Sequence, residues 1–389
     1  MIENALVVGA GIGGLAAGAA LARNGVDVDI VEIRADDHVL GVGINQPGNA
    51  LRALDALGVL DEVIEAGWPF GGIDYRSNRD ERIVYVPSRL GTDRVPANVA
   101  LTRSALRKIL HGAAVTAGVH LHFGTTIEAF HEDETGVRVS FTDGTSRDYD
   151  VVAAFDGVRS SMRRRIFGAE HDPVFVGSSG WRVQLPRPSW LHDIVIYQGD
   201  QVKAGLIPLS EKLCYLLVVT QEPDNPRYDQ TQLTDLLREH LAGFEGPLAS
   251  LRDQISAGVV YSPFFEGCLP GPWYRGRTIV LGDAAHTMVP HLTQGAAMAL
   301  EDAVVLAEEL RQERSVAESL AAVSELRRER VRFVIAASRA ILDSERTVTA
   351  ANLAETITTM RENLPHHVAA VENILNRDFH SAHSVEAVN

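Results

Sequence analysis

The stretch that decides the fold is Ala5–Glu32, "ALVVGAGIGGLAAGAALARNGVDVDIVE". An apolar run at Ala5–Val8 predicts a buried strand, and a glycine turn follows it at once. A helix is expected next, ending near Asn24, and the alternating "VDVDIVE" predicts a second strand. This order of strand, glycine turn, helix and strand is typical of a dinucleotide-binding unit. Its glycines follow the spacing G-x-G-x-x-G: Gly9, Gly11 and Gly14.

Each part of this unit has a physical task toward a dinucleotide. The glycines let the backbone approach a pyrophosphate, and the helix N-terminus directs its amides and the positive end of its dipole at the phosphates. Glu32 stands 23 residues after Gly9, where its carboxylate can accept hydrogen bonds from ribose hydroxyls. A carboxylate disfavours a 2′-phosphate, so the unit favours FAD or NAD over NADP. An NAD dehydrogenase would soon continue with alternating strands and helices, and this chain does not.

A second strand, turn and helix unit lies at 276–303, "GRTIVLGDAAHTMVPHLTQGAAMALEDA". The apolar Thr278–Leu281 predicts a strand that ends in Gly282-Asp283. A loop with Pro290 follows, and a helix is expected to begin at Gly295. This helix would direct its first amides, including that of Ala296, at a negatively charged group.

Length and composition bound the remaining possibilities. A chain of 389 residues predicts two or more lobes, and no apolar run approaches the roughly 20 residues of a membrane span. The net charge of −15 opposes binding to nucleic acid or anionic lipid. Two cysteines without ligand spacing predict neither a metal site nor a disulfide. With no secretory signal at its start, the chain is expected to be cytoplasmic and to bind neither nucleic acid nor membrane.

Between about residues 174 and 265 the pattern changes to alternating strands such as "VFVGSSGWRVQLP" and "KLCYLLVVTQ". An antiparallel sheet that forms one wall of a pocket is the expected structure. The helix "TQLTDLLREHLAGF" is expected to pack behind it.

Four segments together make the chain resemble the class A flavoprotein monooxygenases, the single-component aromatic hydroxylases related to p-hydroxybenzoate and salicylate hydroxylases. They span about residues 1–310, in the family's order: the glycine unit with Glu32, "LTRSALRKIL" with Arg103, "DVVAAFDGVRSSMRR" with Asp156-Gly157, and "GRTIVLGDAAH" with the Pro290 loop and Gly295. One departure is visible. Phe155 stands before Asp156 where relatives usually have alanine.

The resemblance implies an α/β fold with a Rossmann-type FAD-binding domain of the glutathione reductase kind, an inserted antiparallel-sheet substrate domain and C-terminal helices. The expected boundaries are 1–72, 96–173 and 269–312 for the FAD-binding domain, 73–95 and 174–268 for the substrate domain, and 313–389 for the C-terminal helices. The last ten residues, from His380, are expected to be frayed.

The resemblance also implies which residues contact FAD. Gly9, Gly11, Ile12, Gly13 and Gly14 would lie at the pyrophosphate. Glu32 and Arg34 would lie at the adenosine, Ile127 would touch the adenine through its backbone, and Gly43 and Arg103 would lie near the ribityl and phosphate groups. Asp156 and Gly157 form a motif associated with both FAD and the pyridine nucleotide. Gly282 and Asp283 would hold the ribityl chain, and the residues beside the flavin ring would be Pro290, Gly295 and Ala296.

Basic and phenolic residues within the predicted sheet are candidates for the substrate site. Arg182 and Lys203 are expected to bind a carboxylate or phenolate-like oxygen, and Tyr215 to hydrogen-bond a ring substituent. Lys203 is one of only three lysines, and a lysine inside a strand is unusual here. Arg182, Tyr215 and Pro290 are the catalytic candidates, while the weaker substrate candidates are Tyr75 and Tyr197. Each basic residue could instead extend its charge to solvent at the surface.

The activity implied by the resemblance uses bound FAD, NADH or NADPH, and O2 to hydroxylate a small aromatic or heteroaromatic substrate, acidic or phenolic, through a flavin C4a-hydroperoxide. Because reduced flavin is negatively charged, the ring would be the anionic partner of the helix that begins at Gly295. No second glycine motif distinguishes NADH from NADPH. The protein is expected to be a monomer or a homodimer.

Several alternatives remain open. A Baeyer–Villiger or N-hydroxylating flavin monooxygenase could use the same scaffold. A flavin-dependent halogenase is disfavoured because Val183 replaces the second tryptophan of its G-W-x-W motif and no lysine precedes Lys108. A non-catalytic flavin-binding sensor is disfavoured because Pro290 and Gln294-Gly295 are intact.

Three further expectations concern local structure. His286 is interpreted as a packing residue of its loop rather than an acid–base group, because no carboxylate stands at an obvious spacing. Arg163–Arg165 is expected to be a solvated helix face. Ser315-x-x-Glu318 predicts a helix that begins with a capping box, and a further helix, "ANLAETITTMREN", is expected to end before Pro365.

Overall fold

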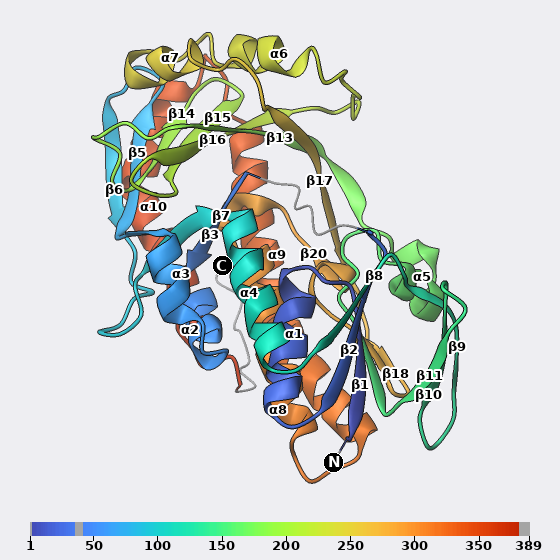
Figure 1. The fold of residues 1–389 in the computed structure, drawn as a ribbon. Coiled ribbons are helices and arrows are strands. Elements are labelled where there is room, and N and C mark those ends of the chain that lie inside the picture. Colours follow the sequence, from blue (N-terminus) through green and yellow to red (C-terminus); the bar gives the residue numbers. More distant parts are fainter. Residues whose placement is uncertain (1, 36–41, 381–389) are drawn as a thin grey trace.

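The structure is a computed structural model and describes residues 2–35 and 42–380. Its first layer is a six-stranded sheet in which all neighbours are parallel except β18 and β19. Helix α1 (Ile12–Arg23) packs against α4 (Arg103–Thr116) and α8 (Gly295–Leu310) beside this sheet (Figure 1). The strands, in spatial order, are β18 (Tyr274–Arg275), β19 (Thr278–Val280), β12 (Val151–Ala154), β1 (Asn4–Val8), β2 (Asp27–Glu32) and β8 (His120–Phe123).

Two three-stranded sheets flank this layer. One consists of β11 (Ser146–Tyr149), β10 (Val137–Phe141) and β9 (Ile127–Glu132). The other consists of β3 (Gly43–Pro47), β7 (Asn98–Thr102) and β4 (Trp68–Phe70), and it lies against α2 (Gly48–Ala56) and α3 (Leu60–Ala66). The short helix α5 (Ser161–Phe167) follows β12.

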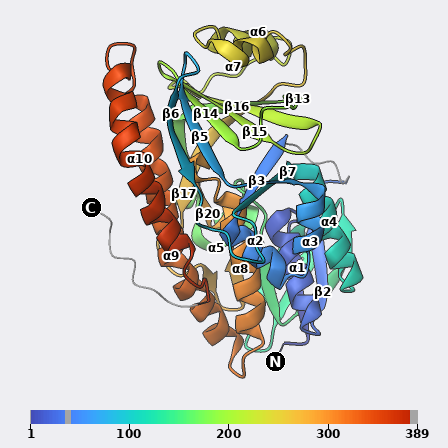
Figure 2. The same ribbon diagram turned by 90° about the vertical axis from the view of Figure 1, so that its left-hand side faces the viewer.

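The second layer is an eight-stranded sheet whose neighbours are antiparallel except β14 and β5. Helices α6 (Leu233–His240) and α7 (Gly246–Arg252) cover its outer face (Figures 1 and 2). The strands, in spatial order, are β20 (His286–Thr287), β17 (Val260–Cys268), β13 (Val174–Pro186), β16 (Leu213–Gln221), β15 (Val202–Pro208), β14 (Ile194–Gln198), β5 (Gly72–Ser77) and β6 (Arg82–Pro87).

Two long helices connect the layers. Helix α9 (Val316–Arg346) packs against α8, and α10 (Leu353–Leu375) runs beside β6 (Figure 2). The capping box predicted at the start of α9 is confirmed, since Ser315 and Glu318 exchange hydrogen bonds between side chain and backbone. The prediction that the last helix ends before Pro365 is wrong. The helix passes through the proline and stays attached to β6, where Arg361 donates to the Ile83 carbonyl at 3.2 Å.

Alternation along the strands gives the eight-stranded sheet two different faces. The outer face is apolar and packs under α6 and α7 with residues such as Trp181, Leu216 and Val218. The inner face faces β3, the loop before α8, and α9, with contacts made by Tyr215, Val219 and Lys203. Polar residues on the inner face therefore lie near the loop that follows β20.

The predicted α/β fold with a second, antiparallel sheet and C-terminal helices is confirmed. The domain boundaries stay a prediction, although β5 and β6 do join the eight-stranded sheet. Of the end expected to be frayed, from His380 onward, residues 381–389 lie outside the described residues. Within the ranges that the structure describes, no helix is long and apolar enough to cross a membrane.

Candidate functional site

The glycine turn between β1 and α1 has the shape that a phosphate needs. Gly9 has φ of +101°, and a Cβ on Gly14 would lie 1.8 Å from the Gly9 carbonyl oxygen, so both positions require glycine. Gly11 is exposed, and a Cβ there would meet no described residue within 4 Å. No side chain caps α1 in the described structure. Its first amides therefore face open space at Gly11, which fits a pyrophosphate.

Glu32 lies at the end of β2 beside this turn. Its Oε2 accepts from the Ala10 amide at 2.9 Å and its Oε1 from the Arg34 amide at 3.0 Å. These two bonds orient the carboxylate and leave further lone pairs for ribose hydroxyls. Arg107 of α4 adds a charge that the sequence reasoning missed, since it donates to the Ala10 carbonyl at 3.1 Å.

The loop from Gly282 to Gln294, called here the flavin loop, connects β19 to α8. Asp302 of α8 anchors its start: Oδ2 accepts from the Gly282 amide at 3.0 Å and bonds His286 Nε2 at 2.6 Å. His286 is fully buried and packs on Trp273, as the packing interpretation expected. The reason given for that interpretation is wrong, because Asp302 supplies the carboxylate from the next helix.

A fully buried polar network holds the other end of the flavin loop. Asn49 of α2 donates to Gln294 at 2.9 Å and to Glu301 at 2.8 Å. Glu301 pairs with Arg330 at 2.8 Å and with Arg327 at 2.7 Å, both from α9. Because these charges are paired and hydrogen-bonded, the network can remain buried and fix the helix start.

Asp283 lies in this loop where the ribityl chain is predicted. Its side chain is exposed, yet protein atoms surround it closely enough that burial raises its pKa, while His286 and Arg103 lower it. A Cβ on Gly295 would approach Asp283 no closer than 3.8 Å. No side chain caps α8 among the described residues. Together these features leave a carboxylate and the first amides of α8 accessible side by side, a set of hydrogen-bonding groups that fits the predicted ribityl and ring contacts of a flavin.

The inner sheet face carries four of the five predicted substrate residues, since Tyr75 is in register with Ile196 of β14 and through it with Gly205 of β15. Arg182 and Leu217 are paired across β13 and β16, and Leu217 pairs with Gly205 of β15, so Arg182, Tyr215 and Lys203 share one face. The Tyr215 ring packs so closely on Gly43 that a Cβ there would lie 2.4 Å from Cδ1. This contact joins the substrate sheet to β3 of the FAD-binding layer.

Tyr197 does not belong to this set. It pairs with Ala204, the neighbour of Lys203, and therefore points to the outer face. There it is fully buried and contacts Phe244 at 6.5 Å between ring centroids. The prediction that Tyr197 contacts substrate on the inner face is corrected by this register.

Arg182 is the most distinctive charge on the inner face. Its guanidinium lies 5.9 Å from the centre of the Phe264 ring, and no carboxylate among the described residues pairs with it. Burial lowers its pKa, Tyr215 raises it, and Arg103 lowers it. An arginine remains protonated under such shifts, so an unpaired cation faces this region. Burial raises the pKa of Tyr215, which keeps the phenol a neutral hydrogen-bond donor.

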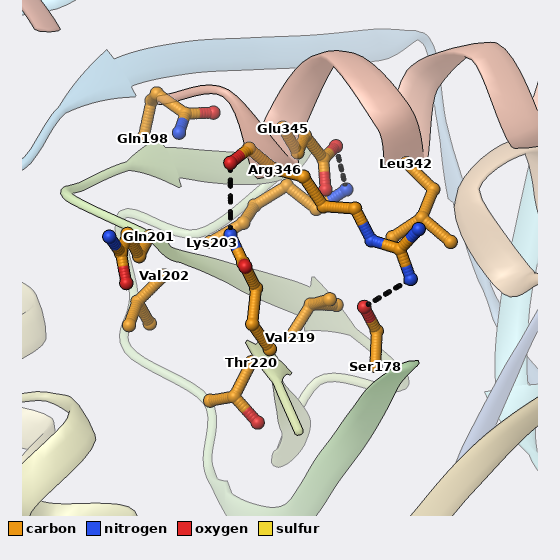
Figure 3. Close-up of a pocket in the computed structure, with 11 residues that line it drawn as sticks. Ser178, Gln198, Gln201, Val202, Lys203, Val219, Thr220, Leu342, Glu345 and Arg346 are labelled. Atoms are coloured by element: carbon orange, nitrogen blue, oxygen red, sulfur yellow. Dashed lines mark hydrogen bonds and ion pairs between the residues drawn. The ribbon is translucent and has the colours of Figure 1, made fainter. Parts of the chain in front are cut away.

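Lys203 is paired, in contrast to Arg182. Its ammonium bonds Glu345 in the last turn of α9 (Figure 3). The other Glu345 oxygen bonds His291 Nε2 at 3.1 Å. Burial alone would raise the pKa of Glu345, but Lys203 and His291 outweigh it and lower the pKa to about 2. Burial lowers the pKa of His291. The sequence reasoning missed Glu345 and His291, although His291 directly follows Pro290.

The other predicted cofactor residues come from several elements, and their contact with FAD stays a prediction. Arg103 begins α4 and acts electrostatically on both Asp283 and Arg182. Asp156 lies against the Gly9 turn through its backbone, and its carboxylate accepts from Ser160 at 2.5 Å and from the Met162 amide at 3.0 Å. Gly157 has φ of +80°. Ile127 begins β9 and is buried.

The prediction that Arg163–Arg165 forms a solvated helix face is wrong for Arg163. It is almost fully buried and donates to the Ala284 carbonyl at 2.9 Å, so it supports the flavin loop from α5. Its neighbour Arg164 is exposed and pairs with Asp172 at 2.7 Å. Within the described ranges no group of acidic, histidine and cysteine side chains could hold a metal ion.

Residues 3–338 match the family described as an FAD binding domain. The chain is 34% identical over 313 residues to 2-heptyl-3-hydroxy-4(1H)-quinolone synthase of Pseudomonas aeruginosa, with 78% of this chain and 79% of that protein covered. It is 31% identical over 316 residues to 6-hydroxynicotinate 3-monooxygenase of Bordetella bronchiseptica, with 77% and 80% covered.

Solved structures give the same result at the level of the fold. The crystal structure of Klebsiella pneumoniae HpxO in complex with FAD and uric acid superposes with a TM-score of 0.85. The sequence identity is 26%, and the match covers 96% of each chain.

Proposed function

Because the chain belongs to the FAD-binding-domain family and is an FAD-dependent enzyme of the class A monooxygenase type, we propose that it uses NADH or NADPH and O2 to hydroxylate a small heteroaromatic acid. Bound FAD would supply the activation of O2 and the transfer of one oxygen atom. The protein's own residues would bind the two molecules, orient them and exclude water.

The observation that carries this proposal is Arg182. It is an unpaired cation on the inner sheet face, where apolar residues such as Leu217 and Phe264 surround it. A carboxylate or an enolate oxygen is the ligand that satisfies such a guanidinium. Urate and hydroxynicotinate are both small heteroaromatic acids, and relatives of this chain are named for them.

Tyr215 would then orient the bound ring. The ring of Tyr215 is fixed on one side by Gly43 of the FAD-binding layer, so the phenol is held in one position on the inner face. As a neutral donor it can hydrogen-bond a ring oxygen without adding charge. Tyr75 lies on the same face and is a further substrate contact in this proposal.

On the cofactor side, the first amides of α1 would hold the pyrophosphate, Glu32 the ribose and Asp283 the ribityl hydroxyls. The amides that open α8 at Gly295 and Ala296 would stabilise negative charge on the reduced ring. Pro290 would stiffen the loop beside the ring without requiring a partner for its nitrogen.

The test is binding of heteroaromatic acids to the FAD-loaded protein, followed by turnover. Hydroxypyridine carboxylates and urate should perturb the flavin absorbance and stimulate NADH or NADPH oxidation, and the product should gain one oxygen atom. Carbon-13 NMR of the product would distinguish ring hydroxylation from insertion into a C–C bond or oxidation of nitrogen. Oxygen on nitrogen or in an expanded ring would replace this proposal by the Baeyer–Villiger or N-hydroxylating alternative.

A further inference from the structure

A small polar pocket lies between the eight-stranded sheet and the end of α9 (Figure 3). It has room for about one water molecule. Lys203 points into it from β15 and meets Glu345 there. The two side chains are only 14% and 16% exposed, so the pair is a feature of the interior.

This pair changes the charge that the inner face presents. By register Lys203 shares that face with Arg182, with one strand, β16, between them. Lys203 is in line with Gly180, two residues from Arg182 along β13. Because strands lie about 4.8 Å apart and both side chains are long, the two cations can still reach one ligand that lies between them. Without Glu345, the face would therefore offer a substrate two cations.

A balance of all the charged side chains around this space gives one cation without an opposing charge. The cations around this space are Arg103, Arg182, Lys203 and Arg346, and the carboxylates are Asp283, Glu345 and Asp343, the last of which pairs with Arg346. Arg103 and Asp283 act on one another electrostatically, and Lys203 pairs with Glu345. Arg182 alone among these residues has no opposing charge. Only a ligand with a single anionic group balances it, and a second carboxylate would be desolvated without a partner.

We propose that Glu345 is a specificity-determining residue, which neutralises Lys203 and thereby restricts the substrate to a heteroaromatic acid with one anionic group. This inference rests on the proposed function, because it specifies the substrate class of the same site. Glu345 acts through Lys203 and does not itself touch the substrate. His291 shares the carboxylate, so the anion is held in place from the flavin loop as well as from the sheet.

Glu345→Gln is the variant that isolates charge. The amide keeps an oxygen acceptor for His291 and removes the charge that neutralises Lys203. The matched control is Glu325→Gln, which makes the same change of side chain at an exposed position of α9 that has no ion-pair partner among the described residues. A double variant, Lys203→Gln with Glu345→Gln, removes both charges of the pair.

The experiment measures Kd from the flavin absorbance change of FAD-loaded protein without reductant. The probes are a hydroxypyridine dicarboxylate and its two monocarboxamides, which have the same shape and one fewer charge. Wild-type protein and Glu325→Gln should bind a monocarboxamide at least about tenfold more tightly than the dicarboxylate. Glu345→Gln should bind the dicarboxylate about tenfold more tightly than wild type does, and the double variant should lose that gain.

Three results would overturn the inference. The first is that wild-type protein binds the dicarboxylate more tightly than the monocarboxamides, a result that does not depend on whether any variant folds. Glu345→Gln could leave the dicarboxylate Kd unchanged, or the double variant could keep the gain, in which case Lys203 is not the released cation. These results differ from failure of the proposed function, in which wild-type protein binds neither probe and the inference fails with it.

Discussion

The phenyl ring of Phe155 lies against Gly13 in the first turn of α1, so that a Cβ on Gly13 would stand 2.7 Å from the ring. Phe155 is buried, and a Cβ on Gly282 would lie 3.3 Å from the same ring and 3.3 Å from Ala299 of α8. The bulky residue that replaces the usual alanine therefore fills the junction of α1, the flavin loop and α8. It does not extend into the open space beside Gly11.

Gly11→Ala should weaken FAD binding without destabilising the fold. Gly11 has φ of −76°, which alanine accepts, and its Cβ would meet no described residue within 4 Å. The apoprotein should keep its thermal unfolding midpoint, because nothing in it is displaced. FAD affinity should fall by about tenfold or more, because the methyl group occupies the space that the pyrophosphate needs. Fluorescence titration of the apoprotein with FAD measures this.

Gly112→Ala provides the control for this prediction. Gly112 lies in α4, is exposed, and also has no described neighbour within 4 Å of a Cβ. FAD affinity should be unchanged, and stability should rise by roughly 0.5 to 1 kcal/mol because alanine favours a helix. Equal FAD affinity of wild type and Gly11→Ala would place the pyrophosphate elsewhere.

Arg182→Ala should weaken substrate binding. Removal of the unpaired guanidinium should raise KM for the acid by about tenfold to a hundredfold, since a charge-assisted hydrogen bond is worth about 1.5 to 3 kcal/mol. The FAD affinity should not change. Arg187→Ala is the control, because Arg187 follows the same strand but lies over Trp68, 4.1 Å from the ring centre. A KM that Arg182→Ala leaves unchanged would remove Arg182 from the site.

Tyr215→Phe should reduce product formed per reduced nucleotide oxidised, and raise the substrate Kd by up to about tenfold through loss of one hydrogen bond. The raised pKa means that Tyr215 stays protonated below its ordinary value of 10. The phenol should therefore impose no pH dependence of its own on substrate binding between pH 6 and 9. If substrate Kd changes with pH between 6 and 9 in wild-type protein and this change is absent in Tyr215→Phe, the phenol ionises in that range and the prediction is wrong.

Acid should destabilise the protein through Asp302 and Glu345. Burial alone would raise the pKa of each group, but charged partners outweigh it and lower both pKa values to about 2. At mildly acidic pH both carboxylates therefore stay ionised in the folded protein, whereas the same groups in the unfolded chain are protonated. Their contribution is complete above about pH 5 and is lost as the pH falls toward 2, on the order of 2 kcal/mol for each group. Urea unfolding at several pH values measures this fall.

Asp302→Asn should flatten that pH dependence, because one of the two titrating groups is gone. The variant should also be less stable at pH 7, by about 3 to 5 kcal/mol, since Arg327 is left with one fewer buried partner. The exposed Asp343→Asn should change neither quantity. If the free energy of unfolding of Asp302→Asn falls with decreasing pH as steeply as that of wild type, other carboxylates cause the fall.

Features that depend on neighbouring residues could be predicted from the sequence. The glycine turn, the start of α8 and the capping box of Ser315 each arise from contacts a few residues apart. Pro365 shows the limit of such rules, because packing of α10 on β6 keeps the helix continuous where the local rule predicts an end.

Features that depend on strand register or distant segments could not be predicted. Tyr197 and Tyr215 are both strand tyrosines, and only the pairing of their strands shows that they point to opposite faces. Glu345 stands 142 residues from Lys203, with no motif to connect them. The one available signal was that a lysine inside a strand of a lysine-poor chain needs a carboxylate partner.

The measurement that tests the central claim most directly is oxygen-dependent NADH and NADPH oxidation by the FAD-loaded protein, with and without hydroxypyridine carboxylates and urate, with product mass recorded beside the Arg182→Ala variant. We expect stimulation by at least one monoanionic acid, a product that gains one oxygen atom, and a strongly raised KM in the variant. Oxidation that no acid stimulates, with hydrogen peroxide as its only product, would contradict the account.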